Sequence, residues 1–258
     1  MIASSMGVFG ERSAVIGHRG LGRGVVTGHR QNTLGSFEAA VRAGVRWVEA
    51  DVRRTGDDTL VVVHDPAYPD GTALADVSGA EVDRRGTLRL RTLFEQLPPE
   101  VGVNVDLKSS IGDCLRPPRL TTAGLLCPVV ADEAARRPLV VSSFDPAALV
   151  RVRHEAPHVA LGLLTWDRFP LEMAVAACAH MDVEVLALHV GSLPRDPRTR
   201  RLDPHSVERV SALVHRSDRE LMVWCPGTGP ARRLLAAGTD AVVVDEVPRA
   251  LRALRAAG

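Results

Sequence analysis

Short apolar runs alternate along the chain with longer segments in which apolar residues recur at helical spacing. The short runs predict strands at 14–17, 47–53, 60–64, 101–107, 139–144, 159–164, 185–189, 220–224 and 241–245. The longer segments predict helices at 36–43, 88–96, 121–135, 146–155, 171–180, 204–215, 230–237 and 248–256. Several of these segments carry a proline near their first residue, which is a common start signal for a helix.

The regular alternation of strand and helix predicts a mostly parallel sheet. So many repeats in 258 residues favour a single domain, residues 1–258, with the α/β fold of a (β/α)8 TIM barrel. An open, doubly wound sheet is the alternative. The strand-like runs outnumber the strands of such a barrel by one, and the link at 55–58 is too short for a helical crossover. We therefore expect an irregular extended unit around strands 2 and 3.

The composition excludes several classes of protein. Hydrophobic residues make up 45% of the chain, which excludes a disordered protein. A net charge of +1 and an aromatic content of 3% argue against a nucleic acid partner. No apolar run reaches the ~20 residues of a membrane helix, so we expect no membrane insertion. Four widely spaced cysteines and the lack of a secretion signal in the opening residues predict a cytoplasmic location.

Acidic residues gather at the predicted strand ends, which form the working face of a barrel. Glu49 and Asp51 share one face of a strand because they are two residues apart, and Asp106 and Lys108 do the same on another strand. Three carboxylates at one mouth repel one another unless they are neutralised. A hard divalent cation, Mg2+ or Ca2+, is one solution, whereas zinc would call for a histidine-rich motif that is absent. A network of salt bridges with arginine or Lys108 is the other.

Two histidines and two cations accompany these acids. His18 and His64 also stand at predicted strand ends, where a pair of histidines suits acid–base chemistry near neutral pH. Arg19 and Lys108 supply fixed positive charge for an anionic group, and Lys108 is the single lysine among the 32 basic residues. A phosphate diester is a substrate that such a set of groups would handle.

The ordered motifs resemble those of the glycerophosphodiester phosphodiesterase family. They are H-R-G at 18–20, N-T at 32–33, E-x-D-V at 49–52, H-D at 64–65, D-x-K at 106–108 and S-F at 143–144, with weaker matches at 223–227 and 238–248. The resemblance spans nearly the whole chain. It implies a phospholipase-C-like barrel, a divalent metal and a small-molecule substrate, a glycerophosphodiester that is hydrolysed to an alcohol and glycerol 3-phosphate.

The resemblance also implies roles for individual residues. By position, the metal ligands are Glu49, Asp51 and Asp106, the acid–base pair is His18 and His64, and the phosphate-binding cations are Arg19 and Lys108. Trp224 either lines the substrate pocket or packs in the core. The oligomeric state is not predicted.

Three residues depart from the family pattern. The family usually has glutamate where Asp106 and Gln31 stand, and threonine where Cys225 stands. The shorter Asp106 side chain must change how a metal is held, and Gln31 removes a negative charge near the mouth. These departures keep two alternatives open. One is a non-catalytic relative that binds phosphate or a metabolite. The other is a lysophospholipase D-like lipid phosphodiesterase, which we rank lower because the segment 66–86 is polar.

The tripeptide Gly-His-Arg occurs twice, but the two copies are not equivalent. His18 ends an apolar strand and opens the motif series, whereas His29 follows a glycine-rich loop. We therefore predict that His29 is a rim residue without a catalytic role. We further predict a structural role for His189 and a core position for Phe144.

Overall fold

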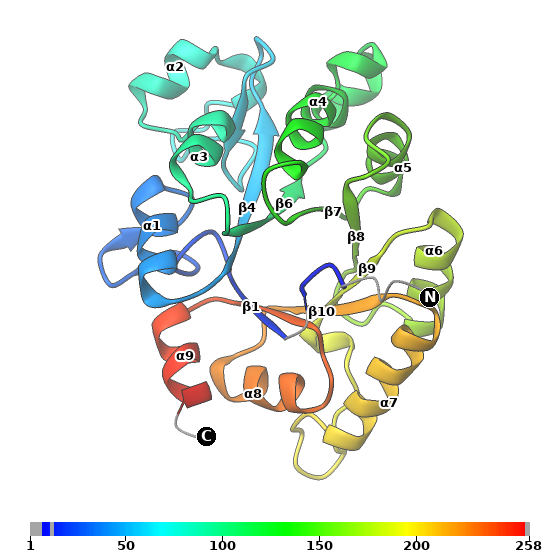
Figure 1. Cartoon of the computed structure of the whole chain (residues 1–258). Helices are drawn as coiled ribbons and strands as arrows, with labels where there is room; N and C mark the ends of the chain where they lie inside the picture. The colour runs from blue at the N-terminus through cyan, green and yellow to red at the C-terminus, as the bar shows by residue number, and fades with distance from the viewer. Residues whose placement is uncertain (1–6, 11–12, 256–258) are drawn as a thin grey trace.

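The computed structural model describes residues 7–10 and 13–255. Eight parallel strands close into a barrel, in the order β1-β4-β6-β7-β8-β9-β10-β11 and back to β1 (Figure 1). Their bounds are Ala14–Gly17 (β1), Trp47–Arg54 (β4), Gly102–Leu107 (β6), Leu139–Ser143 (β7), Ala160–Leu164 (β8), Val185–His189 (β9), Glu220–Trp224 (β10) and Ala241–Val244 (β11). The predicted (β/α)8 TIM barrel is confirmed.

The surplus strand of the sequence pattern is β5, Leu60–Val62, which pairs antiparallel with the end of β4. A short link suffices for an antiparallel return, whereas a parallel strand needs a long crossover. The irregularity expected around the second and third strands is therefore present. The predicted strand extended to His64, but the observed strand ends two residues earlier, so His64 lies on the loop that follows.

The predicted helices are present, with ends that differ from the prediction by at most two residues. Their bounds are Leu34–Ala43 (α1), Leu90–Gln96 (α3), Thr122–Ala134 (α4), Pro146–Glu155 (α5), Leu171–Met181 (α6), Pro204–Arg216 (α7), Thr228–Ala236 (α8) and Val247–Arg255 (α9). The predicted end of the last helix, residue 256, lies outside the described residues.

Several short elements were not predicted. They are helix α2 (Gly79–Arg84), the hairpin strands β2 (Val25–Val26) and β3 (His29–Arg30), and the 3-10 turns η1 (Leu74–Asp76), η2 (Ile111–Leu115), η3 (Pro118–Leu120) and η4 (Val190–Ser192). Each has few residues, so each offers little periodicity to read. His29, predicted as a rim residue after a glycine-rich loop, lies on β3, which pairs with β2.

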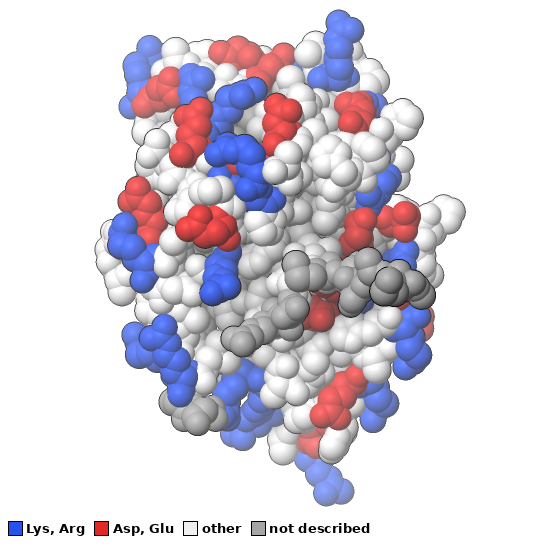
Figure 2. Space-filling view, viewed as in Figure 1, with Lys and Arg blue, Asp and Glu red and all other residues white. Residues whose placement is uncertain are grey.

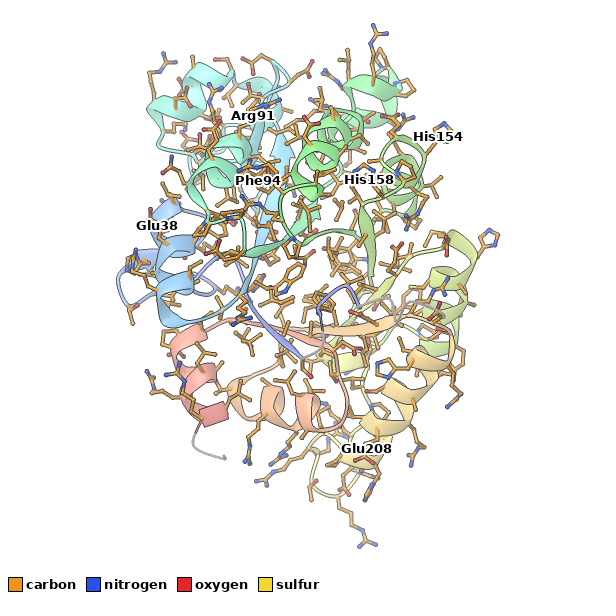
Figure 3. The ribbon with its side chains drawn as sticks, viewed as in Figure 1. Glu38, Arg91, Phe94, His154, His158 and Glu208 are labelled. Atoms are coloured by element: carbon orange, nitrogen blue, oxygen red, sulfur yellow. The ribbon has the colours of Figure 1, made fainter. Side chains whose placement is uncertain are left out.

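Two apolar layers hold the barrel together. Strand residues that point outward pack against the helices, and those that point inward fill the barrel. The helices also have an apolar and a polar face. In Figure 3, Phe94 of α3 turns toward the sheet, whereas Glu38, His154 and Glu208 point away from it. Among the described residues, no helix combines the length and apolar character needed to cross a bilayer.

Residues 7–10, which precede β1, close the barrel at the amino ends of the strands. The Phe9 ring packs edge-on against Trp47, with ring centroids 5.2 Å apart, and the Phe9 N–H donates to Glu220 Oε2 at 3.2 Å. Figure 1 shows this segment crossing the barrel axis. The open mouth is therefore at the carboxyl ends of the strands. On the side of the molecule drawn in Figure 2, basic and acidic residues are interspersed.

Candidate functional site

Three carboxylates lie side by side because of strand register. Asp51 of β4 is the direct neighbour of Asp106 on β6, and Glu49 lies two residues earlier on β4, on the same face. Their exposed fractions are 3% for Glu49, 1% for Asp51 and 8% for Asp106. One oxygen from each lies within 4.8 Å of the others. Residues far apart in sequence therefore form one buried acidic cluster.

Two cations neutralise part of this charge. Lys108 Nζ lies 3.1 Å from Asp51 Oδ1 and also pairs with Asp106. Arg19 Nε lies 3.1 Å from Asp51 Oδ2, to which the Asn32 amide also donates, at 2.9 Å. Burial opposes ionisation of Asp51, but Lys108 and Arg19 outweigh it and hold its pKa below the usual value. The salt-bridge network foreseen as an alternative is thus present around Asp51.

The cluster still has acidic groups that these cations do not satisfy. Burial, together with the charge of Asp51, raises the pKa of Glu49 to about 8. Burial also raises the pKa of Asp106, although Lys108 works against it. Among the described residues, Glu49 Oε1 and Asp106 Oδ1 are buried without a hydrogen-bond partner. An all-oxygen donor set with free, buried oxygens is suited to a hard divalent cation.

His18 follows β1 and is held from both sides of its ring. Its Nδ1 is hydrogen-bonded to the carboxylate of Asp245, and its Nε2 lies 3.8 Å from Glu49 Oε2. Burial lowers the pKa of His18, but the bond to Asp245 and the charge of Glu49 more than compensate, so the pKa is raised. Asp245 follows β11, the parallel neighbour of β1, and was not among the predicted site residues. The signal was available, because an aspartate directly follows the last apolar run.

The turn after His18 fixes Arg19. Arg19 adopts a left-handed backbone (φ 55°), and its N–H donates to Glu49 Oε2 at 2.9 Å. The next residue, Gly20, has φ 94°, and a Cβ there would lie 2.7 Å from Ser36 Oγ at the start of α1. Only glycine fits this close approach. The H-R-G motif is therefore a tight turn that aims a histidine and an arginine at the same acids.

Gln31 replaces an expected glutamate without leaving its neighbours unpaired. Its side-chain oxygen accepts from Arg19 at 3.1 Å and from the Gly24 N–H at 2.7 Å. An amide oxygen accepts hydrogen bonds as a carboxylate does, although it carries no charge. Gln31 therefore makes the acceptor contacts that a carboxylate oxygen could make here, but without the charge.

A cavity of about 590 Å³ opens above the cluster. Of the predicted site residues, it is lined by His18, Arg19, Glu49, His64, Asp106, Lys108 and Trp224, and Asp51 lies beneath its floor. His64 is partly exposed, and its Nδ1 is 2.7 Å from Asp65 Oδ1. The structure thus gathers the predicted residues at one mouth. Their individual roles stay predictions.

The other wall of the cavity is aromatic. Phe144 stacks on Trp166, with ring centroids 4.1 Å apart, and meets the edge of Trp224 at 5.6 Å. Trp224 lines the cavity, contacts the ring of His189 and packs, partly buried, against the inner core, and its role toward a substrate stays a prediction. Phe144 is partly buried against the inner core of the barrel, near the predicted core position, and its ring also lines the cavity. Trp166 was missed, since it lies on an irregular loop after β8.

These features define a class: a (β/α)8 barrel with acids, cations and histidines gathered at the carboxyl ends of its strands. A profile described as the glycerophosphoryl diester phosphodiesterase family matches residues 18–249. The chain belongs to this family, whose members are phosphoric diester hydrolases.

Individual relatives are distant in sequence but similar over most of the chain. A glycerophosphodiester phosphodiesterase of Caldanaerobacter subterraneus subsp. tengcongensis is 23% identical, over 96% of this chain and 100% of its own length. The crystal structure of a glycerophosphodiester phosphodiesterase from Thermotoga maritima has 21% identity and a TM-score of 0.71, over 93% of this chain and 98% of that one.

A phosphodiesterase of Oleispira antarctica, solved in complex with the product sn-glycerol-3-phosphate, has 22% identity and a TM-score of 0.71. The similarity covers 94% of this chain and 96% of that chain. At these identities the solved structures establish the fold.

Proposed function

We propose that this protein hydrolyses glycerophosphodiesters to an alcohol and glycerol 3-phosphate. The observation that carries the proposal is the buried cluster of Glu49, Asp51 and Asp106 at the floor of a cavity that His18 and Lys108 also line. Acids, a histidine and fixed cations that gather in one cavity, some with strongly shifted pKa values, are typical of a catalytic site. Membership of the family supports the same reaction.

We assign a divalent cation, Mg2+ or Ca2+, to Glu49, Asp51 and Asp106. The oxygens of Glu49 and Asp106 that have no hydrogen-bond partner among the described residues support this assignment. When bound, such a cation neutralises the negative charge of the phosphoryl oxygens. Asp106 reaches one methylene less than the glutamate usual in the family.

His18 and His64 exchange the protons in the proposed reaction. Asp245 occupies Nδ1 of His18, which leaves Nε2 to give or take a proton on the cavity side. One histidine removes the proton of the attacking oxygen, and the other protonates the leaving alcohol. The attacking oxygen is that of water or of the substrate's own glycerol hydroxyl.

Arg19 and Lys108 hold the phosphate, and Trp224 contacts the organic part of the substrate. The left-handed turn fixes Arg19 before substrate binds, so the Arg19 side chain loses little conformational freedom on binding. Trp224 Nε1 is buried and has no hydrogen-bond partner within residues 7–10 and 13–255, which supports a donor role toward substrate. We place the protein in the cytoplasm, in keeping with its four unpaired cysteines.

The test measures release of glycerol 3-phosphate from glycerophosphocholine, with Mg2+ or Ca2+ and with a chelator. We expect turnover that the chelator abolishes. Asp51→Asn should lower kcat by on the order of a thousandfold, whereas Glu208→Gln, an exposed acid on α7, should leave it unchanged. No release with any divalent cation would favour the alternative of a non-catalytic phosphate- or metabolite-binding relative.

A second candidate function, lysophospholipase D-like cleavage of a lipid diester, is favoured by one observation. Ile111 is 95% exposed, Leu115 89% and Trp166 64%, and all three lie on loops that follow strands at the open mouth. Exposed apolar side chains beside a cavity are typical of surfaces that meet other apolar groups. From the sequence we ranked this function lower because the segment 66–86 is polar. In the structure, the exposed apolar side chains at the mouth come from the loops after β6 and β8 instead.

A matched pair of substrates separates the two candidates. The double variant Ile111→Ser with Leu115→Ser should leave cleavage of water-soluble glycerophosphocholine unchanged. If the lipid function is correct, the same variant lowers cleavage of lysophosphatidylcholine in micelles by about tenfold. Failure of the parent protein to cleave lysophosphatidylcholine would reject the lipid function, and equal rates on the lipid before and after substitution would reject the role of these two side chains in it.

A further inference from the structure

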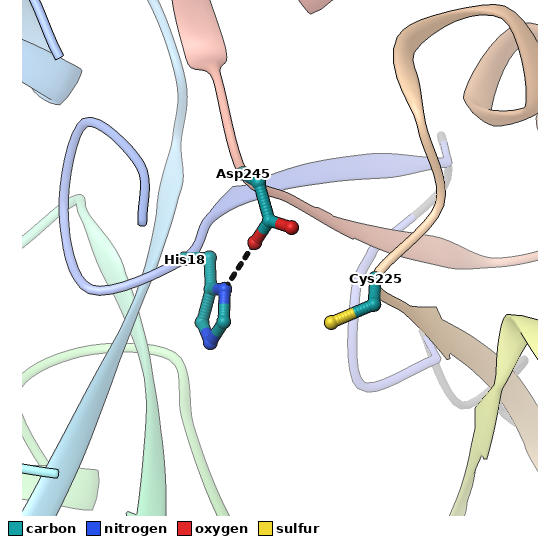
Figure 4. A group of neighbouring side chains, drawn as sticks. All are labelled: His18, Cys225 and Asp245. Carbon is teal, nitrogen blue, oxygen red and sulfur yellow. Dashed lines mark hydrogen bonds and ion pairs between the residues drawn. The ribbon is translucent and has the colours of Figure 1, made fainter. Parts of the chain in front are cut away.

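A second group of potential ligands lies on the other side of His18. Cys225 follows β10, Asp245 follows β11 and His18 follows β1, so three neighbouring strands bring these side chains together (Figure 4). One atom from each, the Cys225 sulfur among them, lies within 4.8 Å of the others. His18 Nδ1 faces Asp245, whereas Nε2 lies toward Glu49. The two ring nitrogens therefore serve two different clusters.

The two clusters differ in donor chemistry. Glu49, Asp51 and Asp106 offer only oxygen, the choice of Mg2+ and Ca2+. His18, Cys225 and Asp245 offer nitrogen, sulfur and oxygen, a set that favours borderline and soft ions such as Zn2+ and Cd2+. Three protein ligands with a fourth position open to the cavity are typical of zinc sites that admit a small ligand.

The thiol of Cys225 departs from the family pattern at this position. The family pattern places threonine where Cys225 stands, and a threonine hydroxyl is a poor ligand for Zn2+. Cys225 has a left-handed backbone (φ 55°), an unfavourable conformation for a side chain with a Cβ. It lines the same cavity as His18, so an ion that enters the cavity reaches both.

The local charge allows a divalent ion. Arg19 and Arg23 also line this part of the cavity and oppose a cation. Arg19 is already paired with Asp51, and the carboxylate of Asp245 together with a thiolate supplies two negative charges. Burial and the charge of Asp245 raise the pKa of the Cys225 thiol to about 11, so without metal the thiol keeps its proton. A bound metal displaces that proton to solvent, with no change of oxidation state.

We propose that His18 Nδ1, Cys225 Sγ and Asp245 form an inhibitory site for Zn2+ and similar ions, separate from the carboxylate site. Metal on Nδ1 leaves the remaining ring proton on Nε2, so His18 can no longer cycle between acid and base. The metal also takes Asp245 away from its role of orienting the ring. Binding at this site therefore stops proton transfer without displacing the cation on Glu49, Asp51 and Asp106.

The first test detects binding and needs no enzymatic activity. With saturating Mg2+ present, titration with Cd2+ should produce one equivalent of the thiolate-to-cadmium charge-transfer band in the ultraviolet. The band should be lost in Cys225→Thr and kept in Cys114→Ser, which removes an exposed cysteine elsewhere. A band of equal size in Cys225→Thr would overturn the proposal.

The second test measures inhibition and rests on the proposed function. Zn2+ should inhibit turnover in saturating Mg2+, and more Mg2+ should not relieve the inhibition. Relative to its own zinc-free rate, Cys225→Thr should need at least about tenfold more Zn2+ for half-inhibition, and Cys114→Ser should match the parent protein. Relief by Mg2+, or equal sensitivity of Cys225→Thr, would overturn the inhibitory role. If no substrate is turned over, the cadmium titration still decides whether the site exists.

Discussion

The two halves of the barrel mouth are built on opposite principles. The half formed by β11, β1, β4 and β6 carries buried charge, with Asp51 held by Arg19, Lys108 and Asn32. The half formed by β7, β8, β9 and β10 carries the aromatic rings of Phe144 and Trp224, which are partly buried, and of Trp166, which is exposed. Charge lies on one wall of the cavity and apolar surface on the other.

This difference indicates which of these residues can be substituted without disrupting the site. A buried charge is costly unless each partner is in place, so removing one member of the charged half leaves others unpaired. An exposed ring such as Trp166 makes no obligatory pair, so its loss changes only what the cavity holds well. We infer that the charged half performs the chemistry and the aromatic half selects the substrate.

The sharpest way to break this comparison is to remove a histidine. His18→Ala and His64→Ala should each lower kcat by about a hundredfold to ten-thousandfold, because each removes a proton donor or acceptor. Steady-state kinetics on glycerophosphocholine measures the loss, and thermal unfolding verifies that both variants fold. Full turnover in both variants would remove the acid–base assignment.

The two halves each contain a histidine–aspartate pair, which allows a matched test. Asp245→Asn should lower kcat by about tenfold to a hundredfold, because the amide no longer fixes the tautomer of His18. Asp167→Asn, which alters the partner of His189, should change kcat by less than about threefold. The pH profile of kcat should shift for Asp245→Asn alone. Equal losses in both variants would contradict the division of labour.

The aromatic half should affect affinity rather than rate. Trp166→Ala should raise KM by about threefold to tenfold with kcat nearly unchanged, the factor expected for the loss of an aromatic contact. Met173→Ala, another exposed apolar side chain on α6, is the control and should leave KM unaltered. A fall in kcat as large as that of the histidine variants would show that the aromatic wall takes part in the chemistry.

The smallest effect is expected at Gln31. Gln31→Glu restores the charge usual in the family, but the glutamine oxygen already accepts from Arg19 and Gly24. We expect kcat/KM to stay within about threefold and the melting temperature to rise by no more than ~3 °C, as for a half-exposed ion pair. A hundredfold gain in kcat/KM would mean that the missing charge limits the activity of this protein.

Much of the barrel was predictable from the sequence because each strand and helix has its own periodicity. The surplus strand was identified as irregular because the link after β4 is too short for a crossover. Glu49, Asp51, Asp106 and His18 were identified because parallel strands present their ends at one edge. The same reasoning missed Asp245, whose role depends on the chain closing β11 against β1.

Phe144 shows why the rest was not predictable. An aromatic residue after a buried strand reads as core, and Phe144 does pack on the inner core, but only the tertiary structure shows that its ring also stacks on Trp166 and lines the cavity. Ile111 and Leu115 likewise lie on a 3-10 turn too short to show a pattern. Irregular loops have no periodicity, so their side-chain positions depend on what they pack against.

The sequence by itself determined the order of strands and helices, the polar residues at the strand ends and the departures at Gln31, Asp106 and Cys225. These follow from local spacing and residue type. Only the tertiary structure decided that Asp51 is paired with both cations, that Asp245 holds His18, and that Cys225 joins them. Barrel closure places the first and last strands side by side, and that contact between distant residues is invisible to local periodicity.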